Sequence, residues 1–109
     1  MAKTIQFTYE GTDYTLEFTR RTVKQMERNG FKVEDVFDKP MTLLPQFFEG
    51  AFLAHHRNVK SETIEAIYKR LPDKQSLIEK LVEMYNDTFN TLLDEPEDDS
   101  KKVEWRADF

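Results

Sequence analysis

The chain has 109 residues, of which 39% are hydrophobic and 34% charged, so it is long enough for one small hydrophobic core and too short for two domains. Its net charge of −5 is opposite to the basic surface that binds phosphate backbones, which argues against nucleic acid as the main partner. The sequence contains no cysteine, which excludes disulfides and thiolate zinc sites, and it has neither a signal peptide nor an apolar run that could span a membrane. A protein of the cytoplasm, with no membrane partner, is therefore expected.

Residues 4–18 alternate between apolar and polar side chains, and this two-residue period predicts a β-hairpin buried on one face. The apolar face comprises Ile5, Phe7, Tyr9, Tyr14, Leu16 and Phe18. The turn is expected at residues 10–13, where Gly11 can take a positive φ. Because a two-stranded hairpin is only marginally stable alone, its aromatic face must pack on helices or on further strands.

After the hairpin the apolar period becomes helical. Thr19 or Thr22 can cap a first helix, which Gly30 ends in the left-handed conformation. A short amphipathic turn follows over residues 33–37 and ends at a Lys-Pro pair. The apolar residues expected to face inward are Val23, Met26, Phe31, Val33, Val36 and Phe37.

A stronger helix is predicted to begin at Thr42 as N-cap. Pro45 would then lie in its first turn, where a missing N–H breaks no helical hydrogen bond. Its buried stripe consists of Leu44, Phe47, Phe48, Ala51 and Phe52, with His55 as an extension of the stripe.

Two more helices complete the body. Ser61 is expected to cap the first, which Leu71-Pro72 ends, and Asp73 begins the second and longest. Their inward residues are Ile64, Ile67, Tyr68 and Leu71 in the first, and Leu77, Ile78, Leu81, Met84, Tyr85, Phe89, Leu92 and Leu93 in the second. The opposite side of the last helix carries Glu79, Glu83 and Asp87 and is interpreted as a solvated face. The predicted fold class is α+β, with one N-terminal hairpin on a bundle of about four helices in a single domain, residues 1–93.

Residues 94–109 are expected to form an acidic tail. They hold seven acidic and three basic side chains and thus carry −4 of the net charge, which leaves the body nearly neutral. Residues 94–100 have no apolar side chain and are predicted to be flexible. Val103 and Trp105 would share one side of an extended segment that ends at Phe109. This segment could add a third strand to its own hairpin or bind another chain.

The sequence gives no positive support for catalysis. His55 and His56 are adjacent, so on a helix they would point about 100° apart, whereas helical metal ligands are spaced by three or four residues. A helix C-terminus, whose dipole favours histidine, is the preferred interpretation. Glu49 is the carboxylate nearest to an apolar stripe, but a surface position is expected for it. No enzyme activity, metal or cofactor is predicted, and methionines, a hairpin edge and the apolar C-terminus favour protein binding instead.

Three segments resemble the small tail assembly chaperones of long-tailed phages and prophages of Gram-positive bacteria. The first is residues 5–31, IQFTYEGTDYTLEFTRRTVKQMERNGF. Residues 41–56, MTLLPQFFEGAFLAHH, are similar to the central helix of that family, and residues 77–88, LIEKLVEMYNDT, to its last helix. An acidic tail follows in both. The similarity lies in the pattern and order of segments over residues 4 to about 93.

This resemblance implies a role without catalysis. Many copies would coat the helical tape measure protein, keep it from aggregating and leave when the tail tube protein polymerises around it. The resemblance also implies self-association and a longer, frameshifted form that recruits the tail tube protein, with this chain as the short form. The alternative function is a small virion component, such as a head-tail joining or tail-completion protein.

The residues expected to contact a partner come from two regions. A client groove is placed among Phe47, Phe48, Phe52 and the last helix, where Met84 and Phe89 lie. Val103 and Trp105 are the second candidate contact. The phenylalanine and methionine stripes are more typical of an ordinary hydrophobic core than of a docking surface.

Overall fold

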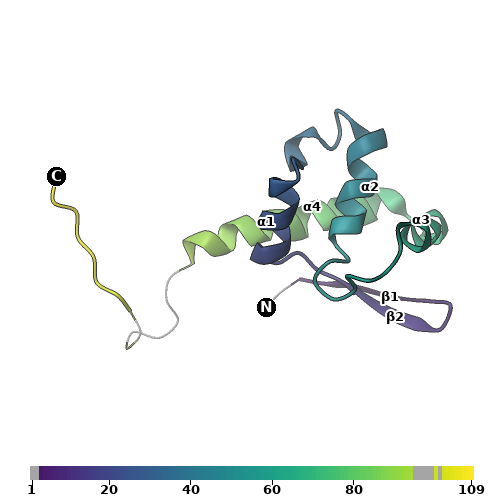
Figure 1. Ribbon diagram of the computed structural model, residues 1–109, viewed down its shortest axis with the longest axis horizontal. Coiled ribbons are helices and arrows are strands. Elements are labelled where there is room, and N and C mark those ends of the chain that lie inside the picture. Colours follow the sequence, from purple (N-terminus) through teal and green to yellow (C-terminus); the bar gives the residue numbers. More distant parts are fainter. Residues whose placement is uncertain (1–2, 95–99, 101) are drawn as a thin grey trace.

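The computed structural model describes residues 3–94, 100 and 102–109. In this part of the chain a two-stranded hairpin precedes four α-helices, so the predicted α+β fold is confirmed (Figure 1). The elements are β1 (Ile5–Tyr9), β2 (Thr12–Leu16), α1 (Arg20–Arg28), α2 (Pro40–Gly50), α3 (Ser61–Arg70) and α4 (Lys74–Asn90), with 3₁₀ turns η1 (Val33–Asp35) and η2 (Thr91–Leu93). The longest helix, α4, runs along the body past α1 and α2 (Figure 1).

The hairpin has the expected alternation and a shorter turn than predicted. β1 and β2 pair antiparallel, with Phe7 opposite Tyr14. Glu10 and Gly11 have φ values of 48° and 80°, and two central residues with positive φ define a type I′ turn. The predicted turn over residues 10–13 is therefore too long, because Thr12 and Asp13 already pair within β2.

Helix α1 has a capping motif at each end. Thr19 is the N-cap: the Thr22 N–H donates to Thr19 Oγ1 at 3.1 Å, and the Thr19 N–H donates to Thr22 Oγ1 at 2.9 Å. The two threonines that the sequence offered as alternative caps thus form one reciprocal capping box. At the other end Gly30 has a φ of 89°, and the Phe31 N–H donates to the Met26 carbonyl at 3.0 Å. This Schellman arrangement turns Phe31 into the core.

Helix α2 begins earlier and ends earlier than predicted. Pro40, not Thr42, opens it, because a proline at the first helical position has a preset φ and no N–H to satisfy. Pro45 consequently lies in the second turn. The helix ends at Gly50, and a series of turns follows. His55 is therefore exposed and does not extend the buried stripe.

The remaining helices follow the sequence pattern with small shifts. Ser61 is the first residue of α3 and not its cap, and Asp73 precedes α4 with a positive φ and no capping hydrogen bond. Three residues that were expected to face inward are exposed instead: Phe37 to 68%, Leu92 to 66% and Leu93 to 84%. Leu92 and Leu93 follow the end of α4, where the chain leaves the body.

The core is rich in aromatic side chains. The Phe47 ring stacks on those of Phe18 and Phe31, and all three rings meet Tyr85 of α4 edge-on. On the hairpin side, Tyr14 packs edge-on against Phe52 at a centroid distance of 5.9 Å. The predicted packing of the aromatic hairpin face on helices is confirmed. Buried residues of β2 and all four helices form a single core, against which the apolar residues of β1 pack.

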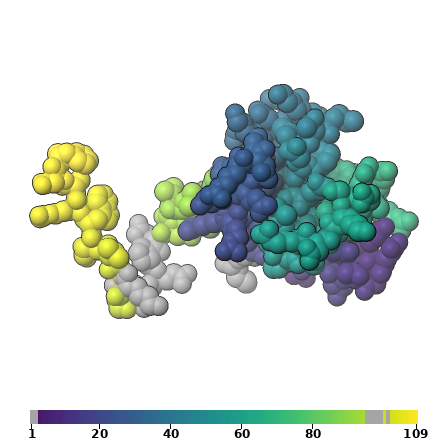
Figure 2. All heavy atoms as spheres, viewed as in Figure 1, coloured from purple at the N-terminus to yellow at the C-terminus, as the bar shows by residue number. Residues whose placement is uncertain are grey.

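Residues 102–109 lie apart from the body and form neither helix nor strand (Figures 1 and 2). The sheet of the described residues has two strands, so the alternative in which this segment adds to its own hairpin is not realised here. The segment predicted to be flexible, residues 94–100, falls largely on residues 95–99, which lie outside the described residues. Among the described helices, none has the length and apolar character needed to cross a membrane.

Candidate functional site

An apolar groove of about 630 Å³ lies between α2 and α3. We call it the α2–α3 groove. Its apolar lining residues are Pro40, Met41, Leu44, Pro45, Phe48, Ile64 and Tyr68. Phe48 and Tyr68 meet edge-on at a centroid distance of 5.1 Å and join the two helices at its floor. Met41 is 91% exposed at its mouth. The groove is thus an open apolar hollow with a flexible thioether at its entrance.

The local sequence explains why α2 presents this side chain to solvent. Pro40 sets the start of the helix, and Met41 in its first turn precedes the buried aromatic residues by more than one turn. Residues three and four apart share a helix face, so Met41, Leu44 and Phe48 form one row along α2. Leu44 is half-buried and Phe48 is buried. The row therefore descends from solvent into the core.

Charged side chains of both signs surround the groove. Glu49 and Glu65 line it together with Lys69 and Lys74. The Lys74 ammonium lies 5.3 Å from the centroid of the Tyr68 ring and donates to the Leu71 carbonyl at 2.8 Å. An apolar floor with a polar rim is the usual anatomy of a site that takes an apolar side chain or a helix face from a partner.

The structure separates the predicted contact residues. Phe47, Phe52 and Met84 are 0%, 1% and 5% exposed and belong to the core. Phe89, on α4, is half-buried and packs edge-on against Tyr85. Phe48 is 2% exposed but forms the floor of the groove. Val103 and Trp105 are 82% and 84% exposed in the C-terminal segment.

The predicted position of the groove, between α2 and the last helix, needs correction. Phe47 stacks on Phe18, which lies between β2 and α1, and meets Tyr85 of α4 edge-on, so it fills that space. Adjacent residues on a helix point about 100° apart, so Phe48 faces α3 instead and the open groove lies there. Ile64 and Tyr68 were assigned only to the core from their spacing. Nothing in the sequence indicates that α3, and not α4, leaves a hollow beside α2.

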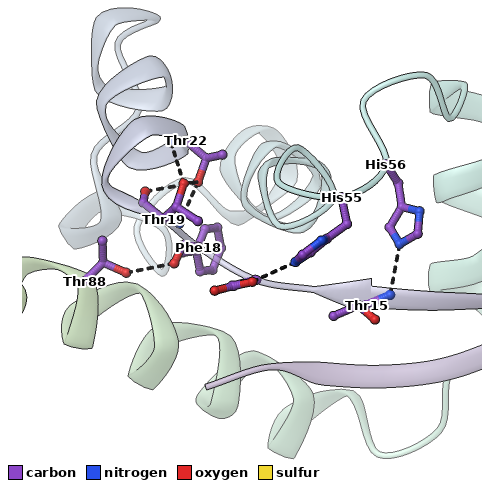
Figure 3. A network of polar contacts seen from close by, with 8 residues as sticks. Thr15, Phe18, Thr19, Thr22, His55, His56 and Thr88 are labelled. Carbon is purple, nitrogen blue, oxygen red and sulfur yellow. Dashed lines mark hydrogen bonds and ion pairs between the residues drawn. The ribbon is translucent and has the colours of Figure 1, made fainter. Parts of the chain in front are cut away.

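His55 and His56 connect the turn after α2 to strand β2 (Figure 3). His55 Nε2 lies 2.7 Å from Glu17 Oε1, and His56 Nε2 accepts a hydrogen bond from the Thr15 N–H at 3.0 Å. The Glu17 N–H donates to the Ala51 carbonyl at 3.0 Å. The histidines therefore face β2. They do not lie at a helix C-terminus as predicted, because α2 already ends at Gly50. Within the described ranges, no group of three histidine, cysteine or acidic residues could hold a metal ion.

A second set of polar contacts joins the hairpin to the C-terminal part of α4. Thr88 Oγ1 donates to the Phe18 carbonyl at 3.2 Å (Figure 3). The Lys3 ammonium lies 2.7 Å from Asp87 and 3.4 Å from Glu83, and its hydrogen bond to Asp87 raises the pKa of Lys3. Glu83 and Asp87, two of the three acidic residues on the predicted solvated face, thus pair with the residue that comes two positions before β1.

Comparisons with known proteins identify the family. No curated protein and no solved structure matches the chain. The profile of a family described as "Domain of unknown function (DUF5055)" matches residues 1–109. The protein therefore belongs to the DUF5055 family.

Proposed function

We propose that this protein is a tail assembly chaperone of a long-tailed phage or prophage, without enzymatic activity, and that it binds the tape measure protein through the α2–α3 groove. The observation that carries the proposal is the groove itself, with its apolar floor at Phe48, Ile64 and Tyr68 and the exposed Met41 at its mouth. The class of client comes from the resemblance of residues 4–93 to these chaperones. The site of action is the host cytoplasm.

The shape and chemistry of the groove suit a helical client. An amphipathic helix presents apolar side chains three and four residues apart, and a groove between two helices can take such a row. Methionine adapts to many apolar partners because its side chain is unbranched and flexible. A groove of about 630 Å³ accommodates a few side chains, so each copy would bind weakly and many copies on one long client would bind firmly. Weak individual contacts also allow release when the tail tube protein polymerises.

Co-expression with the tape measure protein encoded beside this chain tests the proposal. We expect the wild-type chain to keep the client soluble and Met41→Asp to lose most of this effect, because an aspartate at the mouth cannot enter an apolar groove without losing its hydration. Phe37→Asp is the matched control, since Phe37 is also exposed but does not line the groove. A client that is equally insoluble with and without the wild-type chain contradicts the proposal.

Purified mature particles separate the chaperone from the alternative, a small virion component. A chaperone leaves the tail before assembly is complete, so we expect the chain to be absent from purified mature particles. A stoichiometric amount of the chain in those particles would support a head-tail joining or tail-completion protein instead. A longer form with an added C-terminal domain would in addition be expected to bind the tail tube protein.

A further inference from the structure

The two edges of the hairpin differ in how their backbone groups are covered. In a hairpin with a two-residue turn, the residue pairs Tyr9–Thr12, Phe7–Tyr14 and Ile5–Leu16 exchange the interstrand hydrogen bonds. The N–H and C=O groups of the residues between them point outward. On β2 these outward groups meet the turn after α2, since the Thr15 N–H donates to His56 and the Glu17 N–H to Ala51.

Among the described residues, no backbone or side-chain partner covers the outer edge of β1 in this way. Gln6 and Thr8 are its outward residues by the same register, and both are exposed. The sheet within the described residues ends at β1. Unpaired outward groups on an edge strand are a template for another strand.

The apolar face beside this edge is incompletely covered. Tyr14 and Leu16 of β2 are buried, whereas Ile5, Phe7 and Tyr9 of β1 are only half-buried. A third strand beside β1 would place its own apolar side chains next to this row. The row of Ile5, Phe7 and Tyr9 thus favours an incoming segment in which apolar residues alternate with polar ones.

Residues 102–109 have this pattern. Val103 and Trp105 are two positions apart, so in a strand both point to the same face. They are 82% and 84% exposed in a segment without helix or strand, which stands clear of the body in Figure 2. Between and after them, Glu104 and Arg106 would join the polar face of the sheet.

The exit of the tail argues for pairing between copies. Asp94 lines the same cleft as Lys3, Glu17 and Asp87, so the chain leaves the body beside the start of β1. Folding back onto its own β1 would carry the five carboxylates of residues 94–99 past the carboxylates of Glu83 and Asp87. Lys3 pairs with both Glu83 and Asp87, and Lys80 with Glu83, so these two cations are already engaged. The like charges of these carboxylates repel one another when they are brought close together. A tail that extends to another molecule avoids this repulsion.

We propose that residues 102–109 of one copy add to the outer edge of β1 in a second copy of this chain as a third strand. Val103 and Trp105 then cover Ile5, Phe7 and Tyr9, and the backbone pairs with Gln6 and Thr8. Each copy carries one donor segment and one acceptor edge, so the contact is head-to-tail and continues from copy to copy. It uses neither the α2–α3 groove nor a client, and it can be tested without either.

Light scattering after gel filtration of the full chain over a concentration series tests the proposal. We expect the mass of the wild-type protein to rise above 13.0 kDa with concentration. Gln6→Pro removes an outward N–H at a position where edge strands tolerate proline, and Trp105→Asp removes the apolar donor. Each is expected to weaken association at least about tenfold, while the matched control Gln6→Ala keeps the N–H and associates like the wild type.

Mixing the two variants gives the sharper result. Gln6→Pro retains the donor segment and Trp105→Asp retains the acceptor edge, so together they should form a 1:1 complex although neither associates alone. Circular dichroism checks that both variants are folded. If Gln6→Pro is unfolded, the proposal is judged by whether Trp105→Asp loses association. A wild-type chain that stays monomeric at every concentration overturns the proposal, as do oligomers that persist in Trp105→Asp or that Gln6→Ala abolishes.

Discussion

At the scale of single residues, Tyr85 shows how the aromatic core constrains a titratable group. Its side chain is 1% exposed and meets four phenylalanine rings edge-on. Burial, with smaller contributions from the charges of Glu27 and Glu34, raises the pKa of Tyr85 to about 12 from its ordinary value of 10.0. The folded protein thus holds the phenol proton at a pH where the unfolded chain has lost it.

This shift predicts an alkaline loss of stability. Between about pH 10 and pH 12 the unfolded state binds fewer protons than the folded state, so the free energy of unfolding falls as pH rises through this window and is unaffected below it. Tyr85→Phe has no proton to lose. Denaturant titrations at both ends of the window should show wild type losing on the order of 2 kcal/mol relative to Tyr85→Phe. An equal loss in both proteins would show that other groups are responsible.

At the scale of secondary structure elements, the turn after α2 acts as a cover for β2. His56 accepts the Thr15 N–H, and Ala51 accepts the Glu17 N–H. The neighbouring His55 pairs with Glu17 but is itself exposed. The two adjacent histidines therefore contribute differently, because only His56 satisfies a backbone group of the sheet.

The pair can be tested by matched substitutions. We expect His56→Ala to lower the free energy of unfolding by about 1–3 kcal/mol, because it leaves a backbone donor without its partner and removes a ring that packs against Tyr14. His55→Ala should cost about 0–1 kcal/mol, because its contact with Glu17 lies at the surface. Thermal or chemical denaturation measures both. Equal effects of the two substitutions would contradict the assigned roles.

At the scale of the whole molecule, the body and residues 102–109 form separate parts of the chain (Figure 2). Trp105 is the sole tryptophan in the sequence and is 84% exposed. Its fluorescence therefore reports on the C-terminal segment alone.

In dilute solution we expect Trp105 to emit like free tryptophan in water and to be quenched by iodide as strongly as N-acetyltryptophanamide. Rising protein concentration should shift the emission to shorter wavelength, since strand addition in a second copy would bury the indole. Gln6→Pro, with an unchanged tryptophan, is expected to remove this shift. A blue-shifted spectrum at the lowest concentration would mean that the segment packs on its own body.

Local interactions account for what could be predicted from the sequence. The alternation over residues 4–18 determines the hairpin and its buried face, since neighbouring strand residues point to opposite sides. Gly30 ends α1 as expected, because few residues other than glycine adopt its φ of 89°. The boundaries that were wrong, at Thr42 and Ser61, are positions where several nearby residues can begin a helix and packing selects among them.

Tertiary packing alone determines where the α2–α3 groove and the open edge of β1 lie. Phe47 and Phe48 are indistinguishable in the apolar pattern, yet one fills the core against α4 and the other forms the floor of the α2–α3 groove. The open edge of β1 likewise depends on which strand the turn after α2 covers. Hydrophobic periodicity predicts that a side chain is buried but not which partner it packs against, because the hydrophobic effect is non-directional. The groove and the open edge depend instead on which elements come into contact.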